Sequence, residues 1–132
     1  MKIETISVTP LETNCYLISE KNAAVVIDPG EYSLRAADFL RENESCERLI
    51  ILTHAHFDHI GGAVRLREET DTPIAIGAGD FDVLSDPVLN LSAGFGMPVE
   101  PFSADIALRD GELLKTGDIE FKIIETPGHT RG

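Results

Sequence analysis

The sequence is poor in cysteine and in basic residues, and it contains no long apolar run. Its 132 residues include two cysteines, Cys15 and Cys46, which are too few for a disulfide framework, so we expect reduced thiols and a cytoplasmic location. No uncharged apolar stretch approaches the roughly 18–20 residues that a membrane-spanning helix needs. Residues 1–5 lack the apolar core and the cleavage site of a signal peptide. These absences argue against a disulfide-rich secreted protein and against a membrane protein.

The shortage of basic residues leaves the chain strongly acidic. Lys and Arg number 11 against 23 Asp and Glu, which gives a net charge of −12. Such a surface repels phosphate backbones and anionic lipid, so we expect neither nucleic acid nor a membrane as a partner. A bound metal ion could still attract an anionic substrate, because the ion would be the largest local charge.

The hydrophobic pattern predicts an α/β (α+β) fold, with residues 1–132 forming at most one domain. Residues 23–27 and 49–52 are continuously apolar, which is typical of strands covered on both faces. Residues 86–103 are rich in Pro, Gly and Asn and are expected to form a long loop. The predicted strands cover residues 3–8, 15–18, 23–27, 49–52, 73–76 and 119–123, and the predicted helices cover residues 33–43, 60–69 and 80–84.

Two of these helices carry specific expectations. The helix at residues 33–43 should begin with Ser33 as its N-cap and turn Leu34, Ala37 and Leu40 toward the core. The helix at 60–69 begins with two glycines, which are poor helix formers. Either the backbone must pass close to the site there, which glycine permits, or the helix simply begins irregularly.

The four histidines are concentrated in two places. His54 and His56 are two positions apart, so on an extended chain both rings project to the same side. Asp58 and His59 follow at once, which makes four candidate metal ligands within six residues, and His129 comes much later. The first group leaves the C-terminal end of a buried strand, where α/β proteins place their sites. We interpret this group as a metal site; a solvated, histidine-rich loop is the alternative.

The His-Ala-His-Phe-Asp-His motif at residues 54–59, followed by the segment 126–130, resembles the metallo-β-lactamase superfamily. Within it the closest likeness is to the glyoxalase II-type (hydroxyacylglutathione hydrolase-like) branch, which residues 14–18 and 25–30 also match in order. The resemblance implies an αββα sandwich, in which two mixed sheets face each other and helices cover the outside. Because the chain stops shortly after its third ligand motif, we expect it to be the N-terminal part of the domain, with the C-terminal part of the fold missing.

The resemblance also implies a ligand set. In the family one metal ion takes three imidazoles, which correspond here to His54, His56 and His129. Three nitrogen ligands leave a fourth position for water, as in catalytic zinc sites. A second ion would be held by Asp58 and His59, and Asp58 would also orient the attacking water. The bridging aspartate and the further histidine of that second site do not occur in the chain.

Further expectations concern the surroundings of the site and the metal. Asp28 resembles the early aspartate of the family, which orients ligands from outside the coordination sphere; the alternative is a carboxylate that only closes the turn after a strand. The family site implies zinc, with two ions when complete, and iron or manganese is the alternative. The redox-active diiron branch typically has Glu in place of the second histidine, so His56 argues against that branch.

The resemblance implies a hydrolase that cleaves a small-molecule thioester or ester with water activated by zinc. Two alternatives remain: a phosphodiesterase or nuclease of the same superfamily, which the net charge of −12 opposes, and a non-catalytic metal-binding module. A serine hydrolase is disfavoured because no Gly-x-Ser-x-Gly motif occurs. Since two ligands are absent, we expect impaired activity of the 132-residue chain. Its incompletely covered strands predict that it self-associates, lies against a partner chain or folds poorly.

Overall fold

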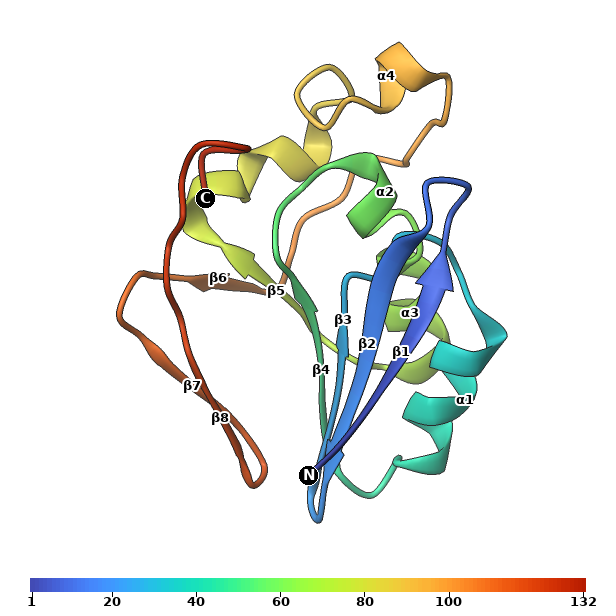
Figure 1. Ribbon diagram of the computed structural model, residues 1–132, viewed down its shortest axis with the longest axis vertical. Helices are drawn as coiled ribbons and strands as arrows, with labels where there is room; N and C mark the ends of the chain where they lie inside the picture. The colour runs from blue at the N-terminus through green and yellow to red at the C-terminus, as the bar shows by residue number, and fades with distance from the viewer.

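The computed structural model describes residues 1–132 as two sheets with helices along one side (Figure 1). The first sheet has six strands in the order β1-β2-β3-β4-β5-β6, antiparallel from β1 to β3 and parallel from β3 to β6, and the second is the antiparallel pair β7-β8. The strands are β1 (Lys2–Val8), β2 (Thr13–Glu20), β3 (Ala23–Ile27), β4 (Glu47–Leu52), β5 (Ile74–Gly77), β6 (Ile106–Leu108), β7 (Leu113–Thr116) and β8 (Ile119–Lys122). The helices are α1 (Leu34–Glu42), α2 (Phe57–Ile60), α3 (Ala63–Thr70) and α4 (Ser92–Phe95), with 3₁₀ turns η1 (Ala78–Asp80) and η2 (Asp82–Ser85).

Alternate residues of the central strands face opposite layers, as the pleat of a strand requires. Val26 and Ile50 pack against the helices, whereas Val25 and Ile51 pack beneath the β7-β8 pair. Val25, Val26 and Ile50 are 0% exposed and Ile51 is 8% exposed. The prediction that these two apolar strands are covered on both faces is therefore confirmed.

The layers agree with the expected mixed α/β architecture. In Figure 1, α1 and α3 lie on one side of the large sheet and β7 and β8 on the other. The second helical layer of an αββα sandwich, which would cover the outer face of β7-β8, is not formed by residues 1–132. None of the helices combines the length and hydrophobicity that crossing a bilayer requires.

The helix predicted at residues 60–69 begins earlier and is broken into α2 and α3. Gly61 and Gly62 separate the two pieces, and the reason is a close backbone approach. A Cβ on Gly61 would lie 2.4 Å from the carbonyl oxygen of Gly30, and a Cβ on Gly62 would lie 2.5 Å from that of Glu31. Glycine is required here because the loop after β3 passes directly over these two positions.

Helix α1 confirms one detail of the sequence analysis and corrects another. Ser33 is the N-cap, since its Oγ accepts a hydrogen bond from the Ala36 amide at 3.4 Å. The inward placement of Leu34 was wrong, because its side chain is 67% exposed. The buried stripe runs along Ala36 and Leu40, and at about 100° per residue Leu34 points away from it. In the predicted loop at 86–103 the chain forms one helical turn, α4.

Cys15 of β2 makes the stability of the fold sensitive to alkaline pH. The free thiol is 0% exposed, and burial, followed by the charge of Asp28, raises its pKa to about 12. An unfolded thiol ionises near pH 8.5, so from there upward the unfolded state loses its proton first and becomes favoured. Between pH 8 and pH 10 this group should lower the free energy of unfolding by about 2 kcal/mol.

Denaturant unfolding at the two pH values, compared between the parent chain and Cys15→Ala, measures this contribution. The variant should lack the additional loss of about 2 kcal/mol, because it has no thiol to ionise. Parallel pH dependences in the two proteins would contradict the assignment.

Candidate metal centre

The candidate ligands gather at one edge of the large sheet, where the parallel strands end. β3 ends next to Asp28, β4 leads into His54 and His56, and the chain beyond β8 returns to the same edge with His129. In Figure 1 these segments come together at the upper end of the sheet. The carboxyl ends of parallel strands are the usual position of a site in an open α/β sheet.

Three imidazoles converge from the two segments. Nδ1 of His56 lies 3.0 Å from Nε2 of His129, 73 positions away in the sequence. One nitrogen from each of His54, His56 and His129 lies within 4.8 Å of the others, and no other group of three or more His, Cys, Asp or Glu residues is this close. Nε2 of His54 is buried without a hydrogen-bond partner. An unpaired buried nitrogen is costly, whereas a cation among the three rings would satisfy it, so the donor set fits a zinc-like ion.

The surroundings keep two of these rings neutral. Burial, followed by the charge of His59, lowers the pKa of His54 to about 4. Burial, followed by the charge of His129, also lowers the pKa of His56. A metal ion binds the neutral imidazole, so both rings are available as ligands at neutral pH without the loss of a proton.

Asp28 connects both parts of the histidine motif. Its Oδ1 accepts from the Thr53 amide at 2.7 Å, and its Oδ2 accepts from Thr53 Oγ1 at 2.6 Å and lies 2.9 Å from His59 Nδ1. Since Thr53 donates its only hydroxyl proton to Asp28, it is left to accept from His54 Nδ1 at 3.0 Å. Both histidines then keep Nε2 free for a metal ion. The backbone of Asp28 has φ of 52°, a strained conformation that these contacts hold in place.

Asp58 and His59 lie beside the three imidazoles but do not complete a second set. Oδ2 of Asp58 is 3.5 Å from Nε2 of His59 and accepts a hydrogen bond from Thr13 Oγ1 at 3.1 Å. Burial opposes protonation of His59, but the hydrogen bond to Asp28 and the charges of Asp28 and Asp58 outweigh it and raise the pKa above its ordinary value. This pair offers one carboxylate and one imidazole, which are too few to enclose an ion by themselves.

Three residues with contacts to the site were missed in the sequence. Thr53 donates a hydrogen bond to Asp28, and Thr13 donates one to Asp58. Asp80 accepts a hydrogen bond from the backbone amide of Ala55 at 3.0 Å. One signal was present for Asp80: it follows β5, the neighbour of β4 in the sheet, and therefore lies at the same edge. Nothing in the sequence pattern distinguishes Thr13.

Gly30 gives the packing of α2 a direct test. A Cβ at this position would lie 1.6 Å from the carbonyl oxygen of Asp58, so Gly30→Ala must push the ligand-bearing helix away. We expect a loss of about 3 kcal/mol in the free energy of unfolding, the upper range for overpacking. Gly94→Ala is the matched control, because nothing lies within 4 Å of its added Cβ. Chemical denaturation of both variants makes the comparison, and equal stabilities would show that the close approach does not exist.

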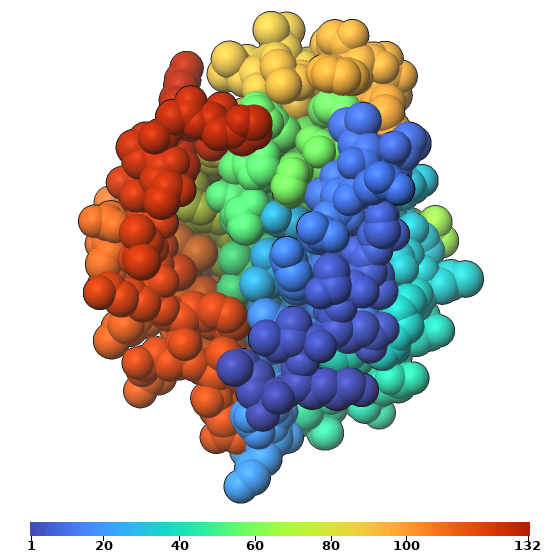
Figure 2. Space-filling view, viewed as in Figure 1, coloured from blue at the N-terminus to red at the C-terminus, as the bar shows by residue number.

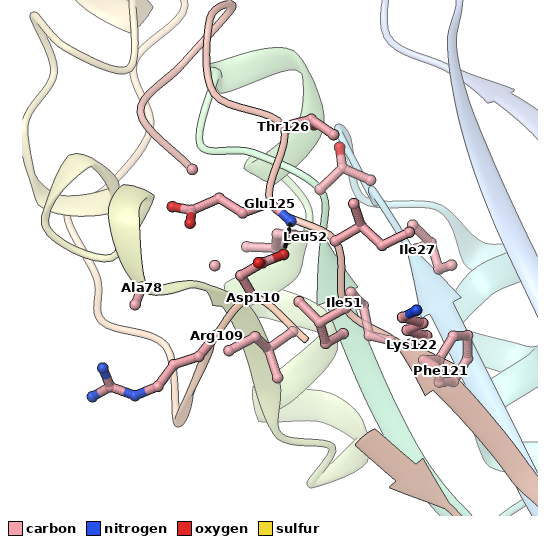
Figure 3. A pocket seen from close by; sticks show the side chains of 16 residues that line it. Ile27, Ile51, Leu52, Ala78, Arg109, Asp110, Phe121, Lys122, Glu125 and Thr126 are labelled. Carbon is pink, nitrogen blue, oxygen red and sulfur yellow. Dashed lines mark hydrogen bonds between the residues drawn. The ribbon is translucent and has the colours of Figure 1, made fainter. Parts of the chain in front are cut away.

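A cavity of about 530 Å³ opens between the two sheets, beside the returning C-terminal segment (Figures 2 and 3). Ile51, Leu108 and Phe121 form part of its apolar wall, and the backbone amide of Glu125 donates to Asp110 at 3.0 Å across it. The β7-β8 pair thus buries the centre of the large sheet but leaves several apolar side chains along this cavity half-buried.

Several known proteins are similar to this chain in sequence and in fold. The sequence pattern of the Metallo-beta-lactamase superfamily matches residues 8–132. The hydroxyacylglutathione hydrolase GloC of Haemophilus influenzae is 36% identical over 100% of this chain and 64% of its own length. The probable metallo-hydrolase YqgX of Bacillus subtilis is 33% identical over 100% of this chain and 63% of its own length. The crystal structure of the BLEG-1 B3 metallo-β-lactamase superposes with a TM-score of 0.84 at 32% identity, covering 99% of this chain and 64% of that one.

The chain spans less than two thirds of the length of these relatives. The part that the relatives match contains both histidine segments, the large sheet and the β7-β8 pair. Sequence pattern, relatives and fold all agree, and the chain belongs to the metallo-β-lactamase superfamily.

Proposed function

We propose that the chain is the metal-binding part of a zinc-dependent hydrolase that cleaves a small-molecule thioester or ester, as in glyoxalase II. One observation carries the metal site: three imidazole nitrogens from distant segments lie within 4.8 Å of one another, and Nε2 of His54 is buried and unpaired. The thioester is supported by the similarity to relatives named hydroxyacylglutathione hydrolase, among them GloC.

Each residue of the site has a distinct task in this proposal. His54, His56 and His129 would hold the ion, which when bound supplies a Lewis acid for the substrate carbonyl and lowers the pKa of a water molecule toward ~7. Asp28 would orient His59 directly and His54 through Thr53. The Asp58 carboxylate, steadied by its hydrogen bond from Thr13, would accept a hydrogen bond from the attacking water. Hydrolysis consumes one water and releases a carboxylic acid and a thiol.

A β-lactam is the second candidate substrate, because the BLEG-1 structure is similar over nearly the whole chain. Both reactions begin with attack of water on a carbonyl carbon, so the same site geometry serves either. A phosphodiester is less favoured, since the net charge of −12 repels nucleic acid.

A substrate panel tests the proposal on the protein expressed from its complete reading frame. A hydroxyacyl-glutathione thioester, a chromogenic β-lactam and a phosphodiester would each be assayed with zinc, after chelation and after zinc is restored. We expect thiol release from the thioester that is lost on chelation and recovered with zinc. Turnover of the β-lactam or phosphodiester alone would overturn the thioester assignment, and activity that survives complete metal removal would overturn the metal mechanism.

A further inference from the structure

Asp80 is a buried carboxylate whose hydrogen bonds all reach the two histidine segments. Its side chain is 1% exposed. Oδ2 accepts from the amide of Ala55 at 3.0 Å, and Ala55 lies between His54 and His56. Oδ1 accepts from the amides of Arg131 at 3.1 Å and Gly132 at 3.0 Å, just beyond His129. One oxygen therefore serves the first ligand segment and the other oxygen serves the second.

The segment that carries His129 has few other attachments. From residue 126 to residue 132, the hydrogen bonds to the rest of the chain are those to Asp80 and the contact between the rings of His129 and His56. Most side chains of this segment are exposed, so apolar packing does not hold it. Asp80 therefore accepts both of the backbone hydrogen bonds that this segment donates to the rest of the chain.

The backbone beside Asp80 fits the same role. A Cβ on Gly79 would lie 2.9 Å from the carbonyl oxygen of Arg131 and 3.0 Å from Cα of Gly132. The segment after His129 thus lies directly on η1, which itself follows β5 at the ligand edge of the sheet. Burying a carboxylate is costly unless every oxygen is hydrogen-bonded, and here the amides of the two ligand segments supply the bonds.

We infer that Asp80 is a positioning residue that holds His129 against the loop of His54 and His56, and thereby sets the affinity of the site for its metal ion. The inference rests on the proposed metal site but not on the proposed substrate. Loss of Asp80 should leave the three imidazoles present but no longer held together.

Zinc affinity, measured by competition with a chelating indicator, tests this without any activity assay. Asp80→Asn keeps the size of the side chain, but its amide nitrogen cannot accept a hydrogen bond, so one of the two segments is released. We expect affinity for Zn²⁺ to fall by about 10–100-fold, as for other residues that orient ligands.

Asp105→Asn is the matched control. Oδ2 of Asp105 accepts from the amide of Ile74 at 2.8 Å, at the opposite end of β5 from the histidines. This variant should lose stability without losing zinc affinity. An equal loss of affinity in Asp105→Asn would show a general structural role and overturn the inference.

Gly79→Ala provides a second route if Asp80→Asn does not fold. The added methyl group crowds the segment after His129 but removes no hydrogen bond from the core, and it should also weaken zinc binding. Unchanged affinity in this variant would count against the inference. If the parent chain bound no zinc, the proposed metal site itself would be wrong. Failure of the metal site can therefore be distinguished from failure of the role of Asp80.

Discussion

A His56→Ala variant is expected to retain no zinc after dialysis, whereas the parent chain retains about one equivalent. Nδ1 of His56 lies nearest to His129, at 3.0 Å, and therefore joins the two ligand segments. Without it, two imidazoles from separate segments remain, which are too few for an ion that takes four ligands. Elemental analysis of the dialysed proteins measures the difference.

Asp58→Ala is the matched comparison, because Asp58 lies outside the group of three imidazoles. It should keep most of the single equivalent. Zinc retention by His56→Ala, or two retained equivalents in the parent chain, would contradict the assignment of one tight site. The second pair, Asp58 with His59, should lose its ion on dialysis.

The second large effect concerns turnover rather than retention. In the protein expressed from its complete reading frame, Asp58→Ala should lower the rate of thioester hydrolysis by about 10²–10⁴-fold, the range for removal of a group that acts on the proton of the attacking water. The structure places its carboxylate beside the imidazoles, with a hydrogen bond from Thr13 that fixes its direction. Steady-state kinetics with metal content measured in the same sample tests this.

Thr13→Val is an informative partner for that experiment. It removes the hydrogen bond to Asp58 while the carboxylate remains, so turnover should fall by much less than in Asp58→Ala. If Asp58→Ala loses its metal in proportion to its activity, Asp58 is needed to hold the ion, and its separate role toward water is wrong.

Much of the fold could be predicted because its signals are local. Residues 23–27 and 49–52 are continuously apolar, and such runs have few solutions other than strands buried on both faces. Ser33 also predicted the start of its helix, because an N-cap side chain bonds to a backbone amide within the first turn. Leu34 was misplaced because a leucine at the first position of a helix carries no information about which side the core will occupy.

The metal ligands of the candidate site could be predicted from the sequence, but the residues that position those ligands could not. Histidines at a strand end, two positions apart, carry their chemistry in the sequence. The role of Asp80 could not be predicted in this way, because it accepts hydrogen bonds from backbone amides 25 and 51 positions away. Nearly every residue type has a backbone amide, so the sequence does not indicate which ones Asp80 contacts. Gly30 is similar, because its need for glycine comes from a contact with Asp58 that only the folded chain brings about. For Gly61 and Gly62, by contrast, the poor helix propensity of two successive glycines already indicated a close backbone approach.

The most direct test of the account is the position of the ion itself. Diffraction from crystals of the zinc-loaded chain, recorded on both sides of the zinc absorption edge, would locate it without reference to activity. We predict one strong site about 2.0–2.1 Å from Nε2 of His54, Nδ1 of His56 and Nε2 of His129. An ion bound only by Asp58 and His59, or placed away from the three imidazoles, would contradict it.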